Sequence, residues 1–132
     1  MIYRLATPAD IEPIREKYGA VWEFSLPAFV ADDGQIRGIL GCHLENGLFL
    51  AGPFHADTGI IAYRLVGHFE DHLRAKGLVQ YIFSVKKTNP WLKIVQRANT
   101  EKIGENDDLI WFRRNLCHKA VTHRVSPQKK GN

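Results

Sequence analysis

The chain is short of the residues on which several classes of protein depend. It has two cysteines, Cys42 and Cys117, too few for a disulfide framework or a four-cysteine metal site. No apolar run approaches the ~20 residues that a membrane-spanning helix needs. The opening MIYRLATPAD reaches a charge at Arg4 and lacks the apolar core of a secretory leader. The sequence therefore predicts a protein of the reducing cytoplasm that does not bind a membrane.

Signatures of several catalytic and metal sites are missing as well. The sequence has no Walker loop, no dinucleotide-binding glycine phrase and no Ser-His-Asp order. His68 and His72 stand one helical turn apart, but Phe69 takes the place of the glutamate in a His-Glu-x-x-His motif. We therefore expect these histidines to lie on the solvated edge of a helix, and we predict no metal. The two cysteines are expected to be small, buried or half-buried side chains.

Acidic residues are absent from the last part of the chain, where none follows Asp108. The basic residues after it are Arg113, Arg114, Lys119, Arg124, Lys129 and Lys130. We expect one domain over 1–125 and a solvated, disordered basic tail over 126–132, because SPQKKGN has no apolar anchor. A nucleic-acid-binding surface that includes Lys86 and Lys87 is an alternative, which steep salt dependence would reveal. No stacking aromatics are interleaved with these residues, so nucleic acid is the weaker candidate partner.

The first half of the chain alternates between strand and turn signals. We predict a strand over 2–6 and then a helix that begins near Asp10, where Thr7-Pro8 is a helix-start signal. Apolar residues recur at helical spacing from Ile11 to Tyr18. The strands expected next are 28–31, 36–44 and 48–54, joined by tight turns at Asp32-Asp33-Gly34 and Glu45-Asn46-Gly47.

Glycine and proline interrupt these predicted strands. Gly38 and Gly41 indicate a bulge or a close approach of another backbone. Pro53 cannot donate a backbone hydrogen bond, so strand pairing is expected to fail there. His55 is then expected just past the end of the strand.

A long helix from about Gly59 to Lys76 is the clearest element of the sequence. Its apolar stripe consists of Ile61, Leu65, Phe69 and Leu73. A strand over 78–85 follows, apolar enough to be buried on both faces. We then expect a helix over 89–102, opened by Asn89-Pro90, and strands at 108–112 and 120–125.

The junction between the strand 48–54 and the long helix predicts an anion-binding site. First-turn N–H groups of a helix lack intrahelical partners, and the helix dipole is positive there. The N–H groups of Asp57, Thr58, Gly59 and Ile60 would hold a phosphate, with the Thr58 hydroxyl as a further donor. The alternative is a plain helix cap, for which Asp57 or Thr58 is sufficient.

These elements and motifs resemble the GNAT acyltransferase superfamily over about residues 2–112. IYRLATPADIEPI is similar to its first strand and helix, and Ala51-Gly52-Pro53 to the strand end that precedes an Arg/Gln-x-x-Gly-x-Gly/Ala phrase. The first glycine of that phrase falls on Gly59, and SVKKTN leads to the asparagine of the next helix, Asn89. The resemblance implies an α+β fold: a central, mixed, mostly antiparallel sheet with an N-terminal meander, splayed parallel strands and helices on both faces.

The resemblance also implies a function, the transfer of an acetyl group from acetyl-CoA to a primary amine of a small molecule or protein. The pyrophosphate of acetyl-CoA would lie on the loop 57–60, with Asn89 across the splay. The cofactor-binding residues implied are Leu50, Ala51, Gly52, Asp57, Thr58, Gly59, Ile60 and Asn89. A backbone N–H near Leu50 to Gly52 would stabilise the oxyanion.

Two side chains are candidate general bases for this reaction. His55 has an imidazole whose pKa lies near working pH; the alternative is a partly exposed loop histidine without a catalytic role. Glu45 could act through a water, but it also belongs to a turn. The aromatic residues Trp22, Phe24 and Phe29 are expected either to line the acceptor pocket or to pack in the core.

The sequence departs from the family pattern at several positions. Ala56 stands where the loop has a basic or amide residue, and Ile61 where it has a small one. Asp57 adds a negative charge, and Gln96 replaces the tyrosine used as a general acid. These departures favour a second function: a catalytically inactive binding or assembly protein that has lost the acetyl-CoA site, with a protein partner or a second copy. Small divergent members of this superfamily are common in bacteria and their phages, so an origin there is expected.

Overall fold

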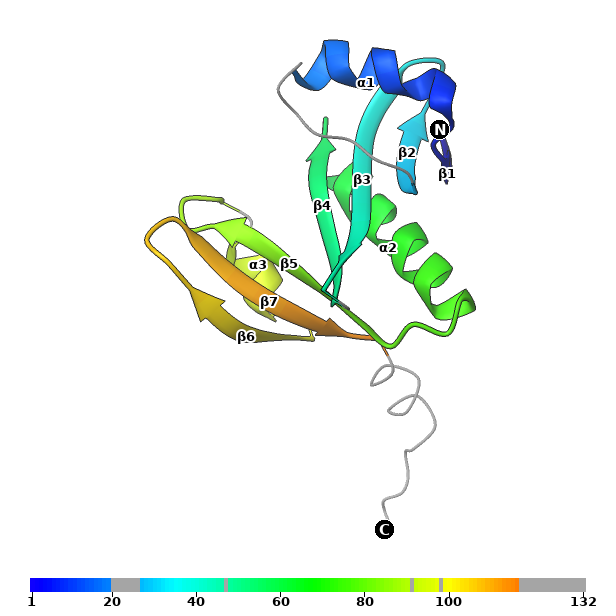
Figure 1. Ribbon diagram of the computed structural model, residues 1–132. Coiled ribbons are helices and arrows are strands. Elements are labelled where there is room, and N and C mark those ends of the chain that lie inside the picture. The colour runs from blue at the N-terminus through cyan, green and yellow to red at the C-terminus, as the bar shows by residue number, and fades with distance from the viewer. Residues whose placement is uncertain (20–26, 47, 91, 98, 117–132) are drawn as a thin grey trace. The chain divides into compact units, whose positions relative to one another are not determined.

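The computed structural model describes residues 1–19, 27–46, 48–90, 92–97 and 99–116. The chain divides into two compact units, Met1–Leu73 and the part from Arg74 onward. Both combine helix with antiparallel strands (Figure 1), so the predicted α+β class is confirmed. We describe each unit in turn.

The first unit is built on an antiparallel meander. Its strands are β1 (Ile2–Leu5), β2 (Ala28–Asp32), β3 (Ile36–Glu45) and β4 (Leu48–Ala56). Each strand pairs with the next one along the chain. The turns fall where the sequence places them, with φ of 107° at Gly34 and 53° at Asn46, angles that glycine and asparagine tolerate best.

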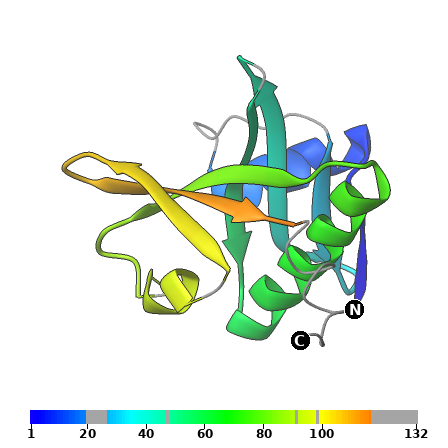
Figure 2. The same ribbon diagram turned by 90° about the horizontal axis from the view of Figure 1, so that it is seen from below.

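Two helices cover opposite faces of this meander, as Figure 2 shows. The short 3-10 turn η1 (Pro8–Asp10) leads into α1 (Ile11–Tyr18), whose Ile14 packs in a core cluster with Ile39. The helix α2 (Gly59–Ala75) buries its apolar stripe. Because consecutive strand residues point to opposite faces, Ile39 faces α1 while the preceding residue, Gly38, faces α2.

The contact between β3 and α2 depends on the absence of a side chain at Gly38. A Cβ there would lie 2.8 Å from Leu65 Cδ1, 3.0 Å from Ile61 Cγ2 and 3.1 Å from the carbonyl oxygen of His55. Gly38 therefore marks a close approach, chiefly of the α2 side chains Leu65 and Ile61, where the sequence predicts a bulge or a neighbouring backbone. Ile61 is 9% exposed, so its bulk is directed into the core at this position.

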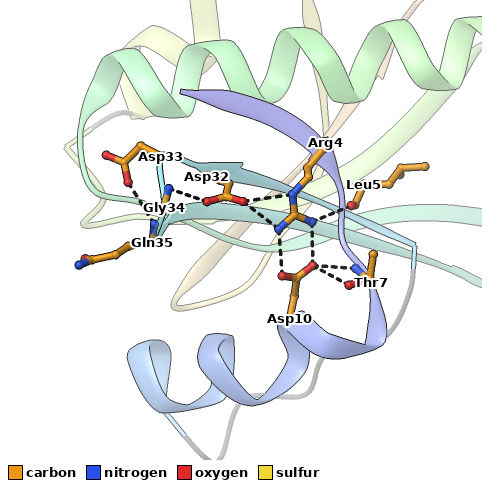
Figure 3. Close-up of polar contacts among 8 residues, drawn as sticks. All are labelled: Arg4, Leu5, Thr7, Asp10, Asp32, Asp33, Gly34 and Gln35. Carbon is orange, nitrogen blue, oxygen red and sulfur yellow. Dashed lines mark hydrogen bonds and ion pairs between the residues drawn. The ribbon is translucent and has the colours of Figure 1, made fainter.

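An ion cluster joins the first turn of the chain to the meander (Figure 3). Arg4 donates to both carboxylate oxygens of Asp10, at 2.8 and 3.0 Å, and to Asp32 at 3.0 Å. Asp10 also accepts from the backbone N–H of Thr7 at 2.7 Å, which closes the predicted helix-start signal as a capping box. The Arg4 guanidinium beside it lowers the pKa of Asp10 to about 2.

The second unit contains a three-stranded antiparallel sheet. Its elements are β5 (Gln80–Lys86), α3 (Leu92–Arg97), β6 (Thr100–Glu105) and β7 (Leu109–Asn115). β7 pairs with both β5 and β6, and β6 is the outermost strand. Leu92 of α3 packs on a core cluster of Val85, Ile110 and Phe112.

Two sequence predictions for this unit are wrong. The expected helix over 89–102 is a short helix followed by the strand β6, whose residues TEKIGE are mostly polar. β5 is not buried on both faces, because Gln80, Ser84 and Lys86 are exposed.

The predicted strand 120–125 lies outside the described residues, as do Trp22, Phe24, Cys117 and the tail 126–132. No helix in the described part of the chain is long and apolar enough to cross a bilayer.

Candidate functional site

The strand β4 runs further than the sequence indicates and contains a bulge. Leu40 pairs with Phe54 and Cys42 with Ala51, so one extra residue of β4 is accommodated at Gly52-Pro53. Pairing is interrupted at Gly52-Pro53, as predicted, and then continues in a shifted register to Ala56, two residues beyond the predicted end of the strand. The Gly52–Pro53 peptide bond is cis.

This bulge lies at the end of Leu50 to Gly52, the stretch in which we predicted the oxyanion donor. Leu50 and Ala51 remain in register with His43 and Cys42. Pro53 has no N–H, and the N–H groups of Leu50, Ala51 and Gly52 remain the candidates. Gly41 faces the bulge, where a Cβ would lie 3.3 Å from the carbonyl oxygen of Gly52.

His55 lies within β4 and not beyond it, paired with Ile39 of β3. Its imidazole stacks on the ring of Tyr18 at the end of α1, with 4.7 Å between ring centroids. Burial lowers the pKa of His55, which favours the neutral form that can accept a proton. His55 is three residues from Gly52, roughly 10 Å along a strand, which is more than one bridging water spans, so its role as a base stays a prediction.

The predicted anion site at the start of α2 keeps part of its donor set. The Asp57 N–H donates to the carbonyl of Arg37 at 2.9 Å, and the Ile61 N–H donates to Thr58 Oγ1 at 3.2 Å. Thr58 is therefore the helix cap. Within the described residues, no hydrogen bond is recorded for the N–H groups of Thr58, Gly59 and Ile60, so these three remain for an anion.

The carboxylate of Asp57 is paired with cations from two other elements. Lys17 Nζ of α1 lies 2.9 Å from Asp57 Oδ2, and Arg37 Nη1 of β3 lies 3.8 Å from the same oxygen. Burial, and then the negative charge of Asp57, raises the pKa of the neighbouring Tyr18 to about 12. Tyr18 is thus a protonated phenol at working pH and is no candidate base.

The remaining predicted site residues are placed on two separate elements. Glu45 ends β3, with Leu48 as its backbone partner. Asn89 follows β5 in the second unit, where its N–H donates to the carbonyl of Lys86 at 2.9 Å and its own carbonyl accepts from Leu92. The roles predicted for these two residues stay predictions.

The other side chains considered for a functional role, His68, His72, Phe29 and Cys42, make packing contacts or are buried. His68 stacks on Tyr3 with ring centroids 4.9 Å apart, and His72 meets the edge of Phe29 at 5.3 Å. Phe29 is itself buried, in agreement with a core role. Burial raises the pKa of Cys42 to about 11, so its thiol is unreactive. Among the described residues no group of three potential ligands could hold a metal.

Sequence reasoning missed three residues around the helix start: Lys17, Tyr18 and Arg37. Lys17 and Asp57 are 40 positions apart in sequence, so no local pattern links them. For Arg37, the signal is a β-bulge, which becomes visible only once the register of β2 and β3 is known. Register changes between Ala31 and Asp32 of β2, which makes Arg37 the extra residue of a bulge in β3 that turns it toward the helix start.

Comparison with known proteins finds agreement in structure and none in sequence. No family model matches the sequence, and no curated protein does. In structure, the chain is similar to an N-acetyltransferase from Staphylococcus aureus Mu50, with 16% identity, a TM-score of 0.69 and coverage of 87% of this chain and 98% of that one. A ribosomal-protein-alanine N-acetyltransferase from Brucella melitensis has 18% identity, a TM-score of 0.60 and coverage of 87% and 99%.

A third similar structure is an aminoglycoside 6'-N-acetyltransferase complexed with coenzyme A, with 13% identity, a TM-score of 0.67 and coverage of 88% and 97%. Agreement at this level extends over almost the whole of each chain. It confirms the fold that the resemblance implies. The chain has the fold of the GNAT acyltransferase superfamily.

Proposed function

We propose that this protein is an N-acetyltransferase that moves an acetyl group from acetyl-CoA to a primary amine of a small molecule or protein. The observation that carries the proposal is its fold agreement with N-acetyltransferases over 87–88% of the chain, one of them complexed with coenzyme A. Because one fold hosts many functions, the proposal also depends on local features of β4 and the start of α2.

The start of α2 fits a phosphorylated ligand in three respects. The N–H groups of Thr58, Gly59 and Ile60 carry the partial positive charge of a helix N-terminus. The charge of Asp57 is offset by Lys17 and Arg37, so it opposes a phosphate less than the sequence suggests. Ile61 packs against Gly38, and its bulk is therefore not directed at the ligand.

Acetyl-CoA supplies a thioester, and the neutral amine nitrogen forms a bond to its carbonyl carbon. The C–S bond breaks, coenzyme A leaves as a thiolate, and the proton of the new C–N centre passes to a base. A backbone N–H within Leu50 to Gly52 would donate to the carbonyl oxygen as negative charge develops on it. His55 and Glu45 are the candidate bases, and Asn89 is the candidate cofactor contact of the second unit.

Binding of the cofactor is tested by thermal unfolding with acetyl-CoA at millimolar concentration. A ligand that binds only the folded state at a hundredfold excess over its Kd adds about 2.7 kcal/mol, which corresponds to roughly 10 °C for a chain of this size. Pantetheine, which lacks the pyrophosphate, is the control and should give a much smaller shift. No shift with acetyl-CoA would contradict the proposal.

The base is tested by replacing each candidate and following amine-dependent thiol release. Loss of a true general base lowers kcat by about 10²- to 10⁴-fold. A base is active when deprotonated, and burial places the pKa of His55 below its ordinary value. The wild-type protein should therefore lose activity as pH falls below about 6.5, where His55 becomes protonated. The His55→Gln variant should not show this loss. Glu45→Gln is the competing variant and His68→Gln the matched control; unchanged rates in both test variants would exclude both bases.

One observation favours the second candidate function, an inactive binding or assembly protein. Ala56 lies in β4 opposite Gly38, where it provides no cation or amide for a phosphate. Failure of acetyl-CoA to bind, together with a stable second copy or a protein partner in solution, would support that function.

A further inference from the structure

The Lys17–Asp57 ion pair lies at the turn between β4 and α2, where the sequence lacks the basic or amide residue of the family pattern. Asp57 is the first residue after β4, and Thr58 caps α2 directly behind it. The loop has no basic side chain of its own, because Ala56 stands at that position. The cations that pair with Asp57 in this turn come from elsewhere in the first unit, Lys17 from α1 and Arg37 from β3.

Both cations are directed at acceptors within the protein. Lys17 Nζ donates to Asp57 Oδ2 and to the carbonyl oxygen of Ile36. Arg37 Nε donates to both carboxylate oxygens of Asp33, at 3.0 and 3.1 Å. The β3 bulge at Arg37 also presents its carbonyl to the Asp57 N–H at 2.9 Å. Asp57 is thus held through both its backbone and its side chain.

This arrangement fixes the peptide that precedes the first free N–H groups of α2. The side chains of Lys17 and Asp57 are 33% and 32% exposed, so the pair is partly shielded from water and stronger than an exposed one. A turn held at two points loses less conformational freedom when an anion binds to the N–H groups behind it.

We infer that Lys17 and Asp57 are positioning residues: their ion pair holds the turn between β4 and α2 in the form that binds the pyrophosphate of acetyl-CoA, in place of a basic loop residue. The inference rests on the proposed function. Neither side chain contacts the ligand in this arrangement. The pair acts through the N–H groups of Thr58, Gly59 and Ile60.

The test is a double-mutant cycle with coenzyme A and pantetheine as probes, measured by calorimetry. Lys17→Met and Asp57→Asn should each weaken coenzyme A binding on the order of tenfold, as expected within one ion-pair network. The double variant should lose no more than either single variant. Pantetheine binding should be unchanged, which a general loss of structure would not produce, and Lys17→Arg should restore most of the coenzyme A affinity.

Arg15→Met is the matched control, because Arg15 lies on the same helix and its nearest carboxylate, Glu12, is 3.9 Å away. Each variant is first shown to be folded by its thermal transition. If Lys17→Met weakens binding while Asp57→Asn strengthens it, Lys17 is a direct phosphate ligand and the inference is overturned. Equal affinity in all variants overturns it as well. If the wild-type protein binds no coenzyme A, the proposed function fails first and the inference fails with it.

Discussion

Gly38→Val is expected to lower the free energy of unfolding by about 3 kcal/mol, the upper part of the range for overpacking a core. The Cβ alone would lie 2.8 Å from Leu65 Cδ1 and 3.1 Å from the carbonyl oxygen of His55. The leucine side chain can rotate, but the carbonyl belongs to the β4 backbone. Relief therefore requires α2 or β4 to move, and urea denaturation with fluorescence detection measures the loss.

Two further variants test whether the loss of stability comes from overpacking the contact between β3 and α2. Gly38→Ala adds only the Cβ and should cost less than the valine. Gly67→Ala is the matched control, because nothing lies within 4 Å of a Cβ at Gly67 of α2. Alanine should stabilise the helix there by about 0.5–1 kcal/mol. A valine at position 38 that leaves the transition unchanged would show that α2 does not pack against β3 as described.

Arg4→Met is expected to destabilise the protein by about 2–3 kcal/mol, somewhat less than loss of a partner from a fully buried pair. Arg4 bridges Asp10 and Asp32, and without it two carboxylates remain close together. Asp10 is 8% exposed, so its charge is poorly solvated. Asp10→Asn in the same background should recover part of the loss, since it removes the unpaired charge.

The same cluster predicts how stability depends on pH. The pKa of Asp10 is about 2 in the folded protein against 3.8 for the free side chain. A lowered pKa stabilises the fold fully above the unfolded value, and that stabilisation is lost as pH falls from about 4 to 2. Arg4→Met should flatten stability in this range, measured by denaturation at successive pH values. A slope equal to that of the wild-type protein would contradict the assignment.

Most of the first unit follows from local signals in the sequence. The apolar stripe of α2, the capping box at Thr7 and the turn residues Gly34 and Asn46 each specify their own element. Such signals act over a few residues, and the chain contains them in the order that the meander requires. The family resemblance then supplied the fold as a whole.

The errors have identifiable physical causes. The predicted helix runs on to Lys102, over the first three residues of β6, because TEKIGE contains a single large apolar residue, Ile103, and a strand at the edge of a sheet needs no alternating pattern. The prediction ends β4 at Phe54, two residues early, because no local signal shows that pairing resumes beyond the bulge at Gly52-Pro53.

The site was harder to predict than the fold, because its contacts are not local. Asp57 was interpreted as a charge that repels phosphate, since its partner Lys17 lies in another helix. His55 was placed in a loop, and its stacking on Tyr18 depends on the register of β3 and β4. Register and bulges are set by the pairing of whole strands, which no short motif contains.

The polar outer strand β6 has a consequence for the behaviour of the protein at high concentration. An unpaired strand edge is a template on which another chain can add and start an aggregate. Here the exposed residues include Glu101, Lys102 and Glu105, and the register shift between Lys102 and Gly104 distorts the edge. A strand added from a second molecule would have to desolvate these charged side chains and would meet a distorted hydrogen-bond pattern, so this edge disfavours growth of the sheet from one molecule into the next.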